Sequence, residues 1–208
     1  MEYLVSDIID KVRIVMDETV NVVSPLFDAT ALDLDTIIRQ SLPDAVKAIH
    51  NTAPTHLLDG KIIASTPVNN QDGSGCILLP DDFMRLIIFK LDGWKRPVVI
   101  PITDQHPDYI LQKNKYVRGG TDKPVCAITT NRSGKKILEY YSLPGSYATH
   151  TISQALYIPV PEIIDNKIDI SPRVLSPVLY QCAALTYIVS KRTDIANYLF
   201  DIVPKLIQ

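Results

Sequence analysis

Residues 85–91 read Arg85-Leu86-Ile87-Ile88-Phe89-Lys90-Leu91, and the pair Asp92-Gly93 follows them directly. Aliphatic and aromatic residues dominate this run, and an Asp-Gly pair is a strong turn signal. The stretch therefore predicts a well-buried β-strand that ends in a turn. It also marks the middle of the chain as β-rich, in contrast to helical patterns on either side.

Other short apolar runs in the middle region are bounded by turn residues, as expected of strands. The polar stretch 69–75 predicts a long turn, Asn131–Gly134 predicts a hairpin loop, and residues 108–115 predict a short helix between strands. Short antiparallel strands joined by polar loops indicate a small sheet or barrel-like module. The further predicted strands are 76–79, 98–100, 125–129, 136–141 and 152–160.

The N-terminal region has helical periodicity. Over Tyr3–Met16, apolar residues recur at three- or four-residue steps, which predicts an amphipathic helix followed by a turn at Ser24-Pro25. A second helix is predicted over 35–51, capped by Asp33 or Asp35. Because proline removes one backbone hydrogen bond, Pro43 predicts a kink or a split with Ser41 as a new cap.

Helical patterns return at the end of the chain. Ser171-Pro172 is a helix start signal, and the run 178–189 is almost wholly apolar. A helix that is apolar on most faces belongs at the centre of a core or an interface. A last helix is predicted near Asp194–Val203, with Ile195, Tyr198, Leu199 and Ile202 on one stripe.

These elements predict an α+β fold in which terminal helices form a bundle and carry an inserted antiparallel β module. The predicted helical part comprises residues 1–60 and 165–208, and the inserted module comprises residues 61–164. Hydrophobic residues make up 46% of the 208, a share that supports a packed core.

The formal net charge of −2 argues against tight, phosphate-driven binding of nucleic acid. The three cysteines, Cys76, Cys126 and Cys182, are odd in number and far apart, so we expect buried thiols in a reducing compartment. The first residues show no secretory signal, and no apolar run approaches the roughly 18 residues of a membrane span. We therefore expect a cytosolic protein without a membrane contact.

Residues with catalytic or ligand-binding potential are present but form no recognisable constellation. His50 and His56 lack the spacing of metal ligands, and no Cys–His nucleophile context is visible. Gly73-Ser74-Gly75 lacks the Lys and the following helix of a phosphate loop, so we interpret it as a hairpin tip. Asp81-Asp82 is interpreted as a turn cap and not as an acid–base pair with Asp104. No catalytic, cofactor-binding or metal-binding residue and no cofactor is predicted.

One segment carries a resemblance to a known family. Residues 78–86 read Leu-Leu-Pro-Asp-Asp-Phe-Met-Arg-Leu, and residues 93–98 read Gly-Trp-Lys-Arg-Pro-Val. The step L-P-x-D-F-x-R-L followed by W-x-R-P-V resembles the adaptor and tail tubular proteins of short-tailed bacteriophages. The layout is also similar: N-terminal helices, a helix ending near Ala53-Pro54, an inserted β domain and a closing helix.

The resemblance implies a virion structural protein, a subunit of a ring in the head–tail connector below the portal. Its expected partners are copies of itself, in a ring expected to be dodecameric, and the portal or other tail ring proteins. DNA would pass through the lumen without sequence-specific binding, and the ring would be assembled in the host cytoplasm. The motif also has a local explanation, in which Pro80 ends a strand and Phe83 fills the core.

Two alternatives remain open from the sequence. The chain could be a non-enzymatic monomeric binding module, or a small hydrolase whose titratable groups converge only in the fold. A ring subunit should bury a large surface against its own copies, on the order of 1,000 Å² or more per contact. A hydrolase should instead bring acids, thiols or imidazoles together in a pocket.

Overall fold

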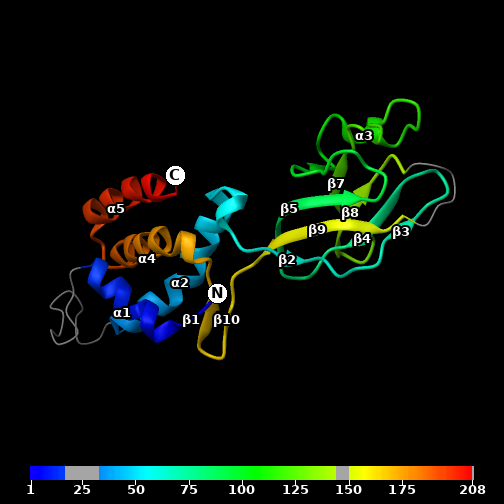
Figure 1. Cartoon of the computed structure of the whole chain (residues 1–208). Helices are drawn as coiled ribbons and strands as arrows, with labels where there is room; N and C mark the ends of the chain where they lie inside the picture. Colours follow the sequence, from blue (N-terminus) through cyan, green and yellow to red (C-terminus); the bar gives the residue numbers. More distant parts are fainter. Residues whose placement is uncertain (17–32, 144–149, 208) are drawn as a thin grey trace. The chain divides into compact units, whose positions relative to one another are not determined.

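The structure, a computed structural model, describes residues 1–16, 33–143 and 150–207. The turn predicted at Ser24-Pro25 lies outside these residues. The chain divides into two compact units: the helical unit comprises Met1–Asp59 and Val160–Gln208, and the β unit comprises Gly60–Pro159. Helices and antiparallel sheets are both present, so the predicted α+β class is confirmed (Figure 1).

The helical unit is organised around α4 (Leu175–Val189). This helix makes contacts with α1 (Val5–Val15), α2 (Leu34–Thr52) and α5 (Thr193–Leu206), and its Val178, Cys182 and Ala183 are fully buried. Because neighbouring helices surround α4, they cover the apolar side chains on most of its faces. The prediction that this run lies at the centre of a core or an interface is therefore confirmed for the core up to Tyr187, whereas Ile188 and Val189 are 45% and 56% exposed. The unit also contains the short 3-10 turns η1 Thr55–Leu57 and η2 Pro172–Val174.

The helix α2 runs without interruption through Pro43, so the predicted split at Ser41 is wrong. Proline removes only the one hydrogen bond that the Arg39 carbonyl would accept inside the helix. The apolar face continues on both sides of this point, with Ile38, Leu42 and Val46 fully buried. Burial of that face holds the helix together across the missing bond. Asp33 occupies the N-cap position but makes no side-chain cap hydrogen bond.

A three-stranded sheet in the helical unit was not predicted. The strand β1 (Glu2–Leu4) pairs with β11 (Lys167–Asp169), which pairs with β10 (Ile163–Ile164). The first helix therefore begins at Val5 and not at Tyr3. Asp165 and Asn166 both have positive φ in the two-residue turn between β10 and β11, a conformation that Asn and Asp tolerate better than most residues. Because β10 pairs within this sheet, the helical unit begins again at Val160.

The β unit contains a three-stranded and a five-stranded sheet among its described residues. Their strand orders are β2-β9-β5 and β3-β4-β8-β7-β6, and every pairing is antiparallel except that of β6 with β7, which is parallel. The strands are β2 Lys61–Ile62, β3 Val68–Asn69, β4 Gly75–Leu78, β5 Phe83–Leu91, β6 Ile102–Thr103, β7 Cys126–Thr130, β8 Lys136–Tyr140 and β9 Ile152–Pro159.

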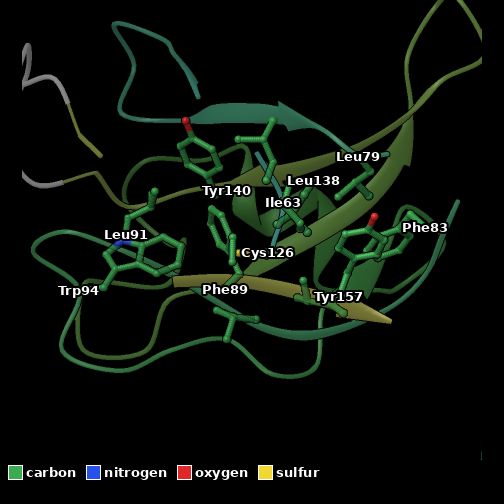
Figure 2. Close-up of a cluster of buried hydrophobic side chains, with 14 residues drawn as sticks. Ile63, Leu79, Phe83, Phe89, Leu91, Trp94, Cys126, Leu138, Tyr140 and Tyr157 are labelled. Carbon is green, nitrogen blue, oxygen red and sulfur yellow. The ribbon is translucent and has the colours of Figure 1, made fainter. Parts of the chain in front are cut away.

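The core of the β unit is built around the aromatic residues shown in Figure 2. The Phe89 ring lies 5.8 Å from the ring centroids of both Trp94 and Tyr140. Phe83 stacks on Tyr157 with the same centroid separation and is 3% exposed, which confirms its predicted place in the core. Such aromatic pairs add to the stabilisation that burial itself provides. The two motif aromatics, Phe83 and Trp94, thus belong to one cluster.

The strand predicted at 98–100 is wrong. Val98 forms a single antiparallel bridge to Phe89, whereas Val99 and Ile100 are 53% and 82% exposed. Prolines at positions 97 and 101 lack the N–H groups that would extend the ladder. The short helix predicted nearby is confirmed as α3 (Tyr109–Gln112).

We predict that Phe83→Ala lowers the free energy of unfolding of the β unit by about 3–5 kcal/mol, because it removes a buried ring that stacks on Tyr157. Urea denaturation followed by the fluorescence of Trp94, the one tryptophan of the chain, measures this directly. Ile62→Ala is the matched control, since Ile62 is 75% exposed and its truncation should cost less than about 0.5 kcal/mol. Equal stabilities for Phe83→Ala and the control would contradict the placement of the motif in the core.

Candidate functional site

A pocket of about 300 Å³ in the β unit is lined mostly by polar side chains. Three segments line it: the turn before β4, the strand β8, and α3 with the residues that follow it. We call it the polar pocket. Its lining residues are Asn70, Asp72, Ser74, Gly75, Cys76, Gln112, Lys113, Arg118, Ile137, Glu139 and Tyr141.

The carboxylate of Glu139 is the centre of a hydrogen-bond cluster. Its Oε2 accepts from the hydroxyls of Tyr109 (2.9 Å) and Tyr141 (2.7 Å). Its Oε1 accepts from the Thr129 hydroxyl at 3.2 Å. A charged acceptor strengthens such bonds, so Glu139 ties α3 to β7 and β8. Its two oxygens are engaged by groups of the protein itself.

The same cluster keeps its tyrosines protonated. Burial is the main cause that raises the pKa of Tyr109 to about 12, and the hydrogen bond to Glu139 and the negative charge of that residue add to it. The pKa of Tyr141 is raised by burial and by Glu139 in the same way. Both phenols therefore remain hydrogen-bond donors at neutral pH, and neither can serve as a general base there.

The turn that borders the pocket explains the Gly73-Ser74-Gly75 motif. It joins β3 to β4, so the predicted hairpin tip is confirmed. Gly73 has a φ of 81°, and a side chain on Gly75 would collide with the Tyr140 ring. Asp72 accepts from the Ser74 hydroxyl at 2.6 Å and the Ser74 N–H at 3.0 Å, and these bonds lower its pKa. The motif thus serves a tight turn and close packing.

A second set of hydrogen bonds fixes the segment that follows α3. Arg118 Nη2 donates to the Asp72 carbonyl at 2.7 Å, and the Gln112 side chain accepts from the Gly119 N–H at 3.1 Å. Gln112 is only 6% exposed, so its bond to Gly119 is partly shielded from water, whereas the bond from Arg118 to Asp72 is exposed. Together with the bond from Tyr109 to Glu139, they form what we call the α3 anchor.

The cysteines are poor nucleophiles. Burial, and to a lesser degree the charge of Glu139, raises the pKa of the Cys76 thiol at the pocket. Burial also raises the pKa of Cys126, and raises that of Cys182 to about 12. The prediction of buried thiols is confirmed for Cys126 and Cys182, whereas Cys76 is only partly buried. Because the thiolate is the reactive form, a raised pKa lowers the reactivity of all three.

The histidines and acids from the sequence analysis do not converge on this pocket. His50 lies on α2, His56 lies in η1, and His106 pairs with Asp108 at 3.8 Å. Asp82 accepts from the Tyr157 hydroxyl at 2.8 Å and pairs with Lys61 at 3.5 Å.

The turn before β5 is closed by the backbone bond from the Phe83 N–H to the Pro80 carbonyl, so a cap by the Asp82 side chain is not needed. Within residues 1–16, 33–143 and 150–207, no group of three or more His, Cys, Asp or Glu is placed to hold a metal.

The helical unit has a different hollow, an apolar groove of about 420 Å³ that we call the helical groove. Residues from α2, α4 and α5 line it, and no acid, base or thiol is among them. Such a lining can bind an apolar group but offers no catalytic one. The lining residues are Ala48, Ile49, Thr52, Pro54, Gln181, Phe200, Val203, Pro204 and Ile207.

The residues of the Glu139 cluster were missed by the sequence analysis. Glu139 and Tyr141 are two positions apart along the β8 pattern, which is a signal for a shared face. Tyr109 lies 30 residues earlier and carries no such signal.

Among the helices in the described part of the chain, none has the length and apolar character to span a membrane.

Comparisons with known proteins give no family assignment. No protein-family model matches the chain, and no curated protein matches its sequence.

We predict that Cys76 reacts slowly with iodoacetamide in the native protein near pH 8, because burial and Glu139 disfavour its thiolate. Mass spectrometry of the intact and digested protein over time gives the rate. The variant Glu139→Gln removes the nearby charge and should raise the rate at Cys76. A native rate equal to that of the urea-unfolded chain would contradict this assignment.

We also predict that Glu139→Leu lowers the free energy of unfolding of the β unit by about 1–3 kcal/mol, because three hydroxyls lose their acceptor. Glu139→Gln keeps one carbonyl acceptor and should cost less. Urea denaturation followed by Trp94 fluorescence compares the two variants. The prediction fails if the leucine variant is as stable as the wild type, or if both variants lose the same amount.

Proposed function

We propose that this chain is a virion structural protein, a subunit of a ring in the head–tail connector of a short-tailed bacteriophage. The ring lies below the portal and forms part of the DNA channel. The observation that carries the proposal is the segment 78–98, whose sequence resembles the adaptor and tail tubular proteins. Its Phe83 and Trp94 are core residues of the β unit, so the motif belongs to the framework of the inserted domain.

The surface of the chain supports a role in assembly. Several large apolar side chains are more than half exposed in each unit, including Ile14 and Tyr198 in the helical unit and Ile100 and Tyr116 in the β unit. Apolar side chains that gather on a surface are characteristic of interaction sites. The partners are copies of the chain, in a dodecameric ring, and the portal or other tail ring proteins.

The chemistry of the polar pocket favours assembly over hydrolysis. The carboxylate of Glu139 is engaged by three hydroxyls of the protein, and the Cys76 thiol has a raised pKa. A hydrolase needs a nucleophile or base that is free to act on a substrate. The cluster instead has the character of a structural network that positions α3.

The net charge is compatible with a channel wall. At a formal charge of −2, the chain as a whole would not retain DNA through dense phosphate contacts. The DNA therefore passes through the lumen without sequence-specific binding. The subunit is assembled into the virion in the host cytoplasm.

A monomeric binding module is the second candidate, and the helical groove is the observation that favours it. At about 420 Å³, this apolar groove is large enough for a small ligand. A binding module would keep the groove open to that ligand, whereas a ring subunit would cover it or leave it unused.

Electron cryomicroscopy of the phage particle that carries this chain tests the proposal. We expect the chain to be traceable between the portal and the tail, in many copies related by rotation about the tail axis. Mass spectrometry of purified particles should find it in a fixed ratio to the portal protein. Absence of the chain from purified particles, or its presence away from the neck, would refute the proposed function.

A further inference from the structure

The two units of the chain carry opposite formal charges. The helical unit contains 9 Lys and Arg against 15 Asp and Glu, which gives −6, whereas the β unit contains 12 against 8, which gives +4. The overall charge of −2 conceals this division. Oppositely charged surfaces attract each other during association and select the partner and its orientation. Each copy of the chain thus offers both members of a complementary pair.

A group of exposed apolar residues lies in α3 and directly after it. We call it the α3 surface. In Figure 1, α3 and its connecting loops extend away from the strands of the β unit. The exposed lysines Lys113 and Lys115 lie on the C-terminal side of α3, whereas the exposed Asp108 precedes the helix, so the cations of this surface are at its C-terminal side. Its apolar members are Ile110, Leu111, Tyr116 and Val117, with exposures from 46% for Leu111 to 84% for Tyr116.

The α3 anchor holds this surface in a defined conformation. Tyr109 ties the start of α3 to Glu139, Gln112 is bonded to the Gly119 N–H, and Arg118 is bonded to the Asp72 carbonyl. A surface that is already ordered loses less conformational entropy when it binds. The polar pocket therefore has a role in assembly, because it fixes the residues that carry the exposed apolar side chains.

The helical groove is the complementary feature of the acidic unit. It is lined mostly by apolar groups of α2 and α5, and its Val203 is buried while Pro204 is exposed at its margin. Two exposed acids, Asp194 and Asp201, lie seven residues apart and therefore on the same face of α5, whose last turn also carries the exposed Lys205. The acidic unit thus combines an apolar hollow with carboxylates on a helix that lines it.

We infer that the α3 surface of one copy binds the helical groove of a second copy. The interface is heterologous, because the two surfaces belong to different units and each copy carries one of each. Repetition of such a contact closes into a ring when the rotation between copies allows it. This inference rests on the proposed function as a ring subunit and identifies the two surfaces through which the subunits meet.

Two variants of the full chain, each defective in one surface, test the inference. In the α3 variant, Lys113→Glu with Lys115→Glu reverses two exposed charges. In the groove variant, Gln181→Lys with Pro204→Lys places two cations at the lining of the groove, and both positions are at least partly exposed. Circular dichroism and urea denaturation establish that each variant is folded. Sedimentation velocity at low salt and high protein concentration then measures association.

We expect the wild type to self-associate and each variant alone to associate at least about tenfold more weakly, because like charges now face each other. A mixture of the two variants should form a 1:1 dimer, since the intact groove of the α3 variant can bind the intact α3 surface of the groove variant. Growth should stop at two copies. The matched control is Arg132→Glu with Lys135→Glu, which makes the same change of net charge in the exposed turn between β7 and β8 and should associate like the wild type.

Three results would overturn the inference: a wild type that stays monomeric at every concentration, a mixture that fails to dimerise, or a control as defective as the α3 variant. Its failure is distinguishable from that of the proposed function. If the mixture dimerises but the phage neck lacks the chain, the interface stands and the ring proposal falls. If the neck contains the chain but the mixture stays monomeric, the ring is built through other surfaces.

Discussion

The pairing of β2 with β9 is the constraint on which the two-unit architecture depends. It places Lys61 opposite Tyr157 and Ile62 opposite Leu156, and adjacent strands lie only about 4.8 Å apart. The chain therefore enters and leaves the β unit at neighbouring positions. A domain with adjacent ends can be inserted into another without separating the two halves of its host. For this reason α2, which precedes the insertion, can pack directly against α4, which follows it.

The second constraint is that α3 must be held to the β unit although few of its residues are buried. Hydrogen bonds of the Glu139 cluster, Gln112 and Arg118 hold the helix in place. The apolar residues Ile110 and Leu111 are 75% and 46% exposed, so they bury little apolar surface and contribute little to the fold. In α3 the apolar side chains are exposed and the polar side chains make hydrogen bonds within the unit, which is the reverse of the usual arrangement. That reversal is the physical reason to regard α3 as a contact surface.

The elements with strong local patterns were predictable from the sequence. The strand at 85–91, the hairpin on either side of Asn131–Gly134 and the apolar helix α4 all have periodicities that short-range physics explains. The predictions were wrong or incomplete where contacts between residues far apart in the sequence, or missing backbone N–H donors, determine the structure. Val98 lies between prolines and forms only a bridge, and β1 depends on a partner strand more than 160 residues away.

The candidate site was even less accessible to sequence reasoning. Its central contact joins Tyr109 to Glu139 across a loop and a hairpin, and no spacing rule anticipates such a pairing. The charge division between the units appears only when the charges are counted for each unit separately and not for the whole chain. The net charge alone suggested a nearly neutral chain, whereas the two units differ by sign.

The dependence of self-association on salt tests the central claim most directly, namely that oppositely charged units of successive copies attract each other. Sedimentation equilibrium of the wild-type chain over a series of NaCl concentrations gives the association constant at each. The account predicts an association constant that falls steadily as salt rises, because mobile ions screen attraction between exposed charges. An association constant that is unchanged or larger at high salt would contradict it, since purely apolar contacts behave in that way.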